Sequence, residues 1–217
     1  MGMSEYIVII GFLLLVLFLF QNGSPFPERW FPSQLANWAF TVLFCIWILA
    51  EIVNNIYSSK NSDSQSQDRG SHRLLVAAIY IAIFAVFILR EFGFGVFSSD
   101  FQYFGLMLLA LGILVREWAI FVLGRHFTVR VQVRKKARLV TEGPYRFIRH
   151  PSYTGSMASY LGLSLAIGSL AGAILVLVLC GISHEYRMRV EEEALLKAFG
   201  SKYEAYKKRT WKLFPGY

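Results

Sequence analysis

The sequence predicts an all-α protein, a multi-pass membrane helical bundle with about six membrane segments, of which the last two form a helical hairpin. Of its 217 residues, 55% are hydrophobic and 17% are charged, whereas soluble domains carry about 25% charged residues. The apolar residues form runs long enough to cross about 30 Å of hydrocarbon. Most Lys and Arg residues fall in the segments that separate these runs.

Four spans are expected in residues 1–123, which we predict to be an N-terminal membrane region. The first run has no preceding Lys or Arg, and no small-residue cleavage pattern follows it, so it is predicted to be a retained helix rather than a signal peptide. A polar loop, 58–73, is rich in Ser, Gln and Asp and is expected to be flexible. The expected spans are Tyr6 to Phe20, Leu35 to Tyr57, Leu74 to Phe97 and Phe101 to Leu123.

Residues 124–217 have a different character and are predicted to be a separate, functional region. Eight Arg and Lys residues lie between Gly124 and Arg149 against a single acid, Glu142, which places this loop in the cytosol by the positive-inside rule. The following apolar stretch is too long for one span and contains Gly168-Ser169 near its middle. It predicts a helical hairpin, Tyr153 to Ile167 and then Leu170 onward, whose second helix leaves the membrane and continues to Phe199.

Charge and cysteine content exclude two classes of function. The net charge of +8 is explained by loops facing an anionic lipid surface, so the bilayer is the expected partner and nucleic acid is not. Cys45 and Cys180 lie inside apolar runs, which predicts neither a disulfide framework nor a metal site.

Five charged residues fall inside predicted spans, where an unpaired ion costs at least a few kcal/mol. Glu51 and Arg116 lie at similar depths, so the sequence predicts an ion pair between them; steering of a polar substrate head is the alternative. The residues are Glu51, Arg90, Glu91, Arg116 and Glu117.

The segment from Gly143 to Gly155, GPYRFIRHPSYTG, stands at the mouth of the hairpin. Pro151 disfavours helix at His150 and suits the first helical position, so His150 is expected at a helix N-terminus. Free N–H groups and the helix dipole there can bind a carboxylate or phosphate, and the imidazole adds a donor. A plain capped membrane helix after a basic loop is the alternative.

A second motif follows on the last long helix. Arg187, Glu191 and Leu195 share one helix face, while Glu192 and Glu193 turn away from it. If the hairpin closes, this face lies beside His150 and offers a cation and a carboxylate at the membrane interface. An ordinary i,i+4 ion pair is the alternative.

Together, the two motifs resemble the isoprenylcysteine carboxyl methyltransferase family and its phospholipid methyltransferase relatives. The resemblance covers about Gly124 to Pro215 and includes the stretches LGRHFT at 123–128 and LVTEGPY at 139–145. It implies a membrane methyltransferase that uses S-adenosyl-L-methionine for carboxyl O-methylation of an isoprenylcysteine-like or other lipid-like substrate. It also implies a cytosolic active site, at the plasma membrane in a prokaryote or the endoplasmic reticulum in a eukaryote. The charge clusters by themselves are satisfied by six membrane segments with both termini cytosolic.

Carried over residue by residue, the resemblance implies that Arg187 holds the carboxylate of a prenylated substrate. Ala137 stands where some eukaryotic members have histidine, so only backbone contacts are expected there. A carboxylate acceptor is already ionised at neutral pH and needs no general base. The implied cofactor pocket consists of Gln132, Ala137, Arg138, Leu139, Val140, Tyr145, His150, Pro151, Ser152, Tyr153 and Glu191.

Three alternatives remain open. A phospholipid N-methyltransferase needs a base for its amine acceptor, and Glu191 or Glu192 is the nearest. NADPH-dependent sterol reductases share the R-H-x-x-Y pattern, but their helix resembles D-E-x-x-C-x-x-K-Y-G, and no strand-linked G-x-G-x-x-G is present here. A non-catalytic membrane scaffold or transporter is the third.

Overall fold

The computed structural model describes residues 26–61, 68–97, 100–131 and 138–216. Within these ranges every regular element is helical, with two isolated β-bridges. The long helices are α2 (Gln34–Asn61), α3 (Ser71–Glu91), α4 (Phe101–Leu123), α5 (Pro151–Ala166) and α6 (Leu170–Phe199), followed by the short α7 (Ser201–Lys208). Three 3-10 turns are η1 (Glu28–Trp30), η2 (Gly124–His126) and η3 (Gly143–Arg146).

Four of these helices, α2, α3, α4 and α6, are long and apolar enough to cross a membrane. The fifth, α5, has 16 residues and is shorter than a usual span. The predicted span from Tyr6 to Phe20 lies outside the described residues, and within those residues the structure has four candidate spans. Helix α3 ends at Glu91 instead of Phe97, because the chain turns where Gly93 and Gly95 adopt positive φ angles.

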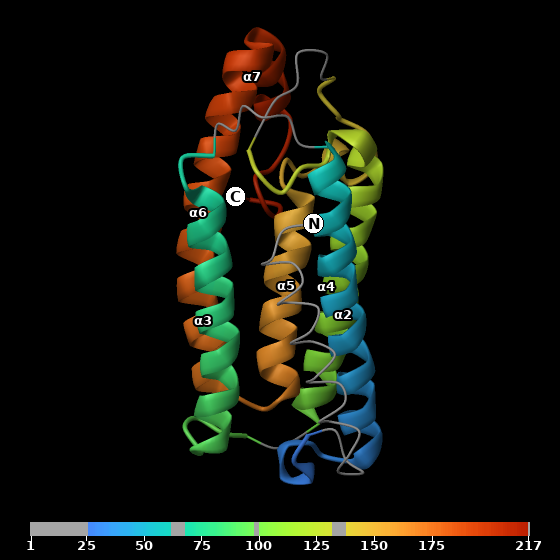
Figure 1. Ribbon diagram of the computed structural model, residues 1–217, viewed down its shortest axis with the longest axis vertical. Helices are drawn as coiled ribbons and strands as arrows, with labels where there is room; N and C mark the ends of the chain where they lie inside the picture. Colours follow the sequence, from blue (N-terminus) through green and yellow to red (C-terminus); the bar gives the residue numbers. More distant parts are fainter. Residues whose placement is uncertain (1–25, 62–67, 98–99, 132–137, 217) are drawn as a thin grey trace.

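The bundle is built from two closely packed helix pairs. Helices α3 and α6 lie side by side, α4 packs along α5, and α2 lies against α4 (Figure 1). Glycines allow α4 and α5 to touch backbone to backbone: a Cβ built on Gly112 would meet the Ser159 nitrogen at 2.5 Å, and one on Gly162 would meet the Leu109 nitrogen at 2.3 Å. Such close approach is a common device for packing membrane helices.

The predicted hairpin is present. Helix α5 ends at Ala166, Gly168 takes a φ of 77°, and the Ser169 hydroxyl accepts a hydrogen bond from the Gly172 N–H at 3.1 Å. Helix α6 then runs without a break to Phe199, with Gly200 as its C-cap. Helix α6 is longer than α5, so it passes the level at which α5 begins near Glu191 and Glu192, which contact Tyr153 and His150.

The expected ion pair in the membrane interior is also present. Arg116 Nε lies 2.6 Å from Glu51 Oε1, and Arg116 Nη1 donates to the Ser156 hydroxyl at 2.6 Å. Arg90 is buried and donates to the carbonyl oxygens of Arg29 and Gly168. Charges inside the bundle thus have polar partners, as the cost of isolated ions in hydrocarbon requires.

Candidate functional site

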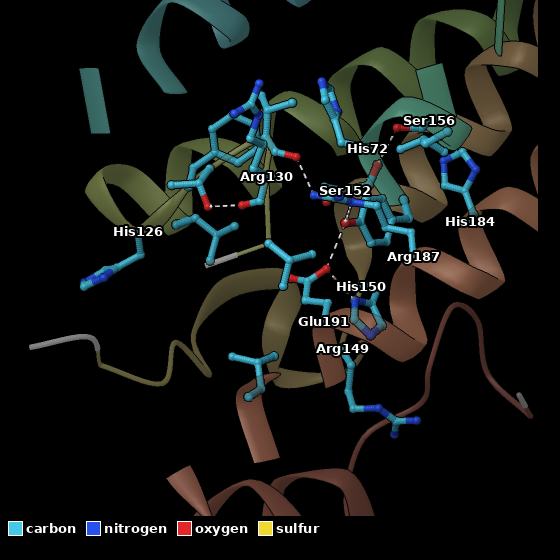
Figure 2. A pocket seen from close by; sticks show the side chains of 18 of the residues that line it. His72, His126, Arg130, Arg149, His150, Ser152, Ser156, His184, Arg187 and Glu191 are labelled. Carbon is cyan, nitrogen blue, oxygen red and sulfur yellow. Dashed lines mark hydrogen bonds and ion pairs between the residues drawn. The ribbon is translucent and has the colours of Figure 1, made fainter. Parts of the chain in front are cut away.

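A pocket opens at the end of the bundle where α5 begins and α6 ends, which we call the basic end. Its wall includes the loop 123–131, residues 138–140, the start of α5 and the last turns of α6 (Figure 2). From there it reaches inward past Tyr153 to Ser156, Tyr160 and His184, and sideways to Leu75, Val76 and Ile79 of α3. The pocket therefore joins a basic, polar mouth to an apolar interior.

The start of α5 has the predicted geometry. His150 is the N-cap residue, with non-helical φ and ψ, and Pro151 occupies the first helical position. The N–H groups of Tyr153 and Thr154 both bond to the His150 carbonyl, and Pro151 has none to give. The Ser152 N–H is left without a backbone partner in the described ranges, so this helix start retains one free donor beside the pocket.

The C-terminal tail holds this helix start in place. The backbone N–H of His150 donates to the Lys212 carbonyl at 3.1 Å, and that of Arg149 donates to the Trp211 carbonyl at 2.8 Å. The Thr154 hydroxyl donates to the Leu213 carbonyl at 2.6 Å. The tail thus braces the loop at the pocket mouth through backbone pairing.

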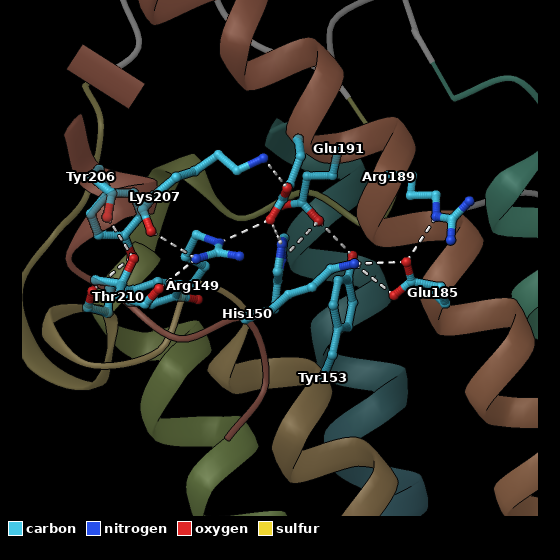
Figure 3. Close-up of polar contacts among 12 residues, drawn as sticks. Arg149, His150, Tyr153, Glu185, Arg189, Glu191, Tyr206, Lys207 and Thr210 are labelled. Atoms are coloured by element: carbon cyan, nitrogen blue, oxygen red, sulfur yellow. Dashed lines mark hydrogen bonds and ion pairs between the residues drawn. The ribbon is translucent and has the colours of Figure 1, made fainter. Parts of the chain in front are cut away.

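The two neighbouring glutamates of α6 divide their contacts. Glu192 does not line the pocket and binds Arg149 Nε at 3.0 Å, His150 Nε2 at 3.2 Å and Lys207 Nζ at 2.9 Å. These three partners are labelled in Figure 3. Glu191 lines the pocket and accepts a hydrogen bond on Oε2 from the Tyr153 hydroxyl at 2.8 Å. Its Oε1 makes no hydrogen bond or ion pair with the described residues, and its side chain is one-third exposed, so it can receive a ligand donor.

His150 is held between these two acids. The residue is 4% exposed, and its ring stacks on the Tyr153 ring at 5.5 Å and places Nδ1 3.7 Å from Glu191 Oε2. Both ring nitrogens therefore face carboxylates in this arrangement. Direct donation from His150 to an anionic ligand remains a prediction.

Arg187 lies at the centre of the pocket wall with its side chain almost fully buried. Nη1 donates to Asp68 at 2.5 Å and to the Ser71 hydroxyl at 2.9 Å, Nε donates to the Tyr153 hydroxyl at 3.1 Å, and Nη2 donates to the Val129 carbonyl. A guanidinium has five N–H donors. The fifth, on Nη2, has no partner in the described part of the chain and is the donor left for a substrate.

Asp68 is a site residue that sequence reasoning missed, because it falls in the polar stretch expected to be a flexible loop. It is buried, accepts hydrogen bonds from the N–H groups of His72 and Val131, and pairs with Arg187. Burial opposes ionisation, but these backbone donors and the Arg187 charge outweigh it and hold the pKa of Asp68 below its usual value. The carboxylate therefore stays ionised and fixes Arg187.

Two buried tyrosines also contribute to the pocket. The hydroxyls of Tyr145 and Tyr203 have no hydrogen-bond partner within the described residues, although the Ser152 hydroxyl lies near that of Tyr145. Burial, followed by nearby glutamates, raises the pKa of both phenols, so each remains a protonated donor at neutral pH. Buried hydroxyls left unpaired are costly, which indicates that a polar ligand completes them.

The structure brings together nearly all of the site residues predicted from sequence. Gln132 and Ala137 lie outside the described residues, and Pro151 is buried at the α5 start without lining the pocket. Within the described ranges, no group of three or more His, Cys, Asp or Glu side chains is placed so that it could bind a metal ion. The predicted residues that line the pocket are Arg138, Leu139, Val140, Tyr145, His150, Ser152, Tyr153, Arg187 and Glu191.

Comparison with known proteins gives consistent relatives. The phospholipid methyltransferase family matches residues 101–202. Protein-S-isoprenylcysteine O-methyltransferase B of Arabidopsis thaliana is 35% identical over 108 residues, 49% of this chain and 55% of its own. The Schizosaccharomyces pombe enzyme is 33% identical over 113 residues (51% and 48%), and the Homo sapiens enzyme is 35% identical over 115 residues (48% and 38%).

The chain spans about half the length, or less, of these curated relatives. A solved structure described as the eukaryotic intramembrane Ras methyltransferase, isoprenylcysteine carboxyl methyltransferase, superposes with a TM-score of 0.56 at 18% identity, covering 100% of this chain and 87% of the other. This likeness shows the fold. The resemblance predicted from the motifs is therefore confirmed: this chain is a helical membrane protein similar to the isoprenylcysteine carboxyl methyltransferases and their phospholipid methyltransferase relatives.

Proposed function

We propose that this chain is a membrane methyltransferase that uses S-adenosyl-L-methionine for carboxyl O-methylation of an isoprenylcysteine-like or other lipid-like acceptor. The observation that carries the proposal is the single pocket that joins the polar basic end to apolar side chains of α3 inside the bundle. A water-soluble cofactor and a bilayer-dissolved acceptor can meet there. The curated relatives that match half of the chain point to the same chemistry.

The pocket mouth fits the polar parts of the cofactor. The unpaired hydroxyls of Tyr145 and Tyr203 and the Ser152 N–H supply donors, and the free oxygen of Glu191 supplies an acceptor. When bound, S-adenosyl-L-methionine supplies an electrophilic methyl group on a sulfonium. The proposed cofactor set is Gln132, Ala137, Arg138, Leu139, Val140, Tyr145, His150, Pro151, Ser152, Tyr153 and Glu191.

On the acceptor side, Arg187 would orient the carboxylate through its remaining Nη2 donor. Asp68, Ser71 and the Tyr153 hydroxyl bind Nη1 and Nε of Arg187. These bonds hold the guanidinium plane in place, so the free N–H on Nη2 points in one fixed direction. The acceptor carboxylate is ionised at neutral pH and attacks without a base. The chain's contribution is then alignment of the reactants and exclusion of water, effects that can supply several kcal/mol.

The orientation of the molecule follows from its charge distribution. Arg125, Arg130, Arg138 and Arg146 lie in the loops of the basic end, so we propose that this end faces the cytosol. The pocket mouth, α7 and the C-terminus are then cytosolic. The plasma membrane is expected in a prokaryote and the endoplasmic reticulum in a eukaryote.

Phospholipid N-methylation is the second candidate, since that family matches residues 101–202. An amine acceptor must lose a proton, and Glu191 is the carboxylate in the pocket with an oxygen free to take it. Glu192 is occupied by three cations and is poorly suited to this role.

Purified protein in lipid vesicles, given a labelled methyl donor and a farnesylated N-acetylcysteine, tests the proposal. We expect base-labile label on the acceptor, as a methyl ester gives, and no stable label on phosphatidylethanolamine. Stable label on the phospholipid would favour the second candidate. Tight binding of NADPH without binding of S-adenosylhomocysteine would contradict both.

A further inference from the structure

The inner part of the pocket contains a buried histidine that the proposed reaction does not use. His184 is 1% exposed yet lines the pocket (Figure 2). It lies three residues before Arg187 on α6, so that His184, Arg187, Glu191 and Leu195 form one pocket-facing stripe along the helix. His184 is the member of this stripe farthest from the basic end.

The hydrogen bond of one ring nitrogen defines what the other can do. His184 Nδ1 lies 2.7 Å from the Cys180 carbonyl oxygen. A carbonyl only accepts, so Nδ1 carries the hydrogen. No carboxylate in the described ranges pairs with this ring, and a buried site near cationic Arg187 favours neutral imidazole. The Nε2 atom is therefore a hydrogen-bond acceptor, and no described residue donates to it.

We propose that His184 is a specificity-determining residue, whose Nε2 accepts a hydrogen bond from an amide N–H next to the carboxylate of the acceptor. The inference rests on the proposed function, because it takes the acceptor carboxylate to be at Arg187. Three residues of helix separate His184 from Arg187 by about 4.5 Å along the axis. In an N-acylated amino acid the amide nitrogen and the carboxylate share one carbon, so a single acceptor can reach both groups.

The surroundings of His184 keep this contact selective. The Tyr153 ring meets the His184 ring edge-on at 5.4 Å, and the Tyr160 ring lies at 6.0 Å. These ring contacts hold the imidazole in one orientation at the pocket wall. An acid without an N–H leaves Nε2 buried and unpaired, and a site built for a hydrogen bond discriminates against such an analogue.

Two acceptors that differ only at this group provide the test: N-acetyl-S-farnesylcysteine and 3-(farnesylthio)propionic acid, which lacks the acetamido group. We expect wild-type kcat/KM to favour the first by roughly tenfold or more. His184→Asn keeps a donor near the Cys180 carbonyl but has no atom at Nε2, so the preference should fall to about one. His184→Gln places an amide near Nε2 and should retain part of the preference.

Ser183→Ala is the matched control, because Ser183 is buried on the same helix and also donates to the Cys180 carbonyl, at 3.1 Å, but does not line the pocket. Its preference should equal that of the wild type. S-adenosylhomocysteine binding checks that each variant is folded. An unchanged preference in His184→Asn, or no preference in the wild type, overturns the inference alone. Methylation of neither acceptor overturns the proposed function and the inference with it.

Discussion

Removal of the Asp68 carboxylate should be among the most damaging single changes outside the helices. Arg187 has 4% of its side chain exposed and is paired with Asp68, whose own side chain is 11% exposed. Taking one partner from a buried pair leaves an uncompensated charge, at a cost of about 3–5 kcal/mol. For a chain of this size, about 3 kcal/mol corresponds to a fall in Tm of roughly 6–12 °C.

Asp68→Ala can be compared with a matched change at the next residue. Arg69 pairs with Glu193, but both side chains are more than half exposed, and such surface pairs contribute at most about 1 kcal/mol. Thermal unfolding in detergent should therefore show a large fall in Tm for Asp68→Ala and little change for Arg69→Ala.

A double variant distinguishes the loss of the ion pair from the cost of leaving a buried charge unpaired. Asp68→Ala with Arg187→Leu leaves no buried ion, so its Tm should recover part of the loss seen in Asp68→Ala. If Asp68→Ala unfolds within 2 °C of Arg69→Ala, or if the double variant is less stable than the sum of the two single changes, the reasoning about the buried pair is wrong.

Three further outcomes are expected. Gly162→Ala should strongly lower the yield of folded protein, because its Cβ would meet the Leu109 nitrogen at 2.3 Å. A Cβ on Gly181 would have nothing within 4 Å, so Gly181→Ala should leave the yield unchanged. Equal yields of the two variants would refute the close packing of α4 and α5. Glu191→Gln should weaken S-adenosylhomocysteine binding by calorimetry, while Arg187→Ala should spare binding and abolish turnover; equal affinities in both would contradict the assignment. The pKa of Asp68 in the folded protein lies below its ordinary value of 3.8. The contribution of the Asp68 carboxylate to the free energy of unfolding is therefore complete above pH 3.8 and is lost as the pH falls through the lower pKa of the folded state. The Tm gap between wild type and Asp68→Ala should narrow below about pH 4, and a gap that widens there would exclude this linkage.

Helix positions followed from the sequence wherever an apolar run had clear ends. Helix α4 has the predicted bounds, Phe101–Leu123, with Asp100 as its N-cap residue and Gly124 as its C-cap residue. The hairpin was also predictable, since Gly168 supplies the positive φ that the turn needs. The predicted end of α3 was wrong by six residues, because Phe92 to Phe97 are apolar but contain two glycines that turn the chain.

Site residues were predictable where they belong to local motifs. The spacing along the chain predicts the local geometry of two residue pairs: His150 beside Pro151, and Arg187 four residues before Glu191. The structure places all four in or against one pocket. Asp68 and Tyr203 carry no such signal. Each reaches the site through contacts between segments more than ten residues apart, which no local pattern encodes.

The sequence by itself determined the membrane setting, the helix periods and the two motifs, because hydrophobicity and helix spacing are local properties. Only the tertiary structure decided that, among the described residues, a single N–H donor of Arg187 has no partner. Its other donors bind Asp68, Ser71, Tyr153 and Val129, which come from three other segments. The same holds for the closeness of α4 and α5, which depends on glycines of two helices meeting. Burial and pairing are properties of the packed bundle, and they decide which of the predicted charges remain available for chemistry.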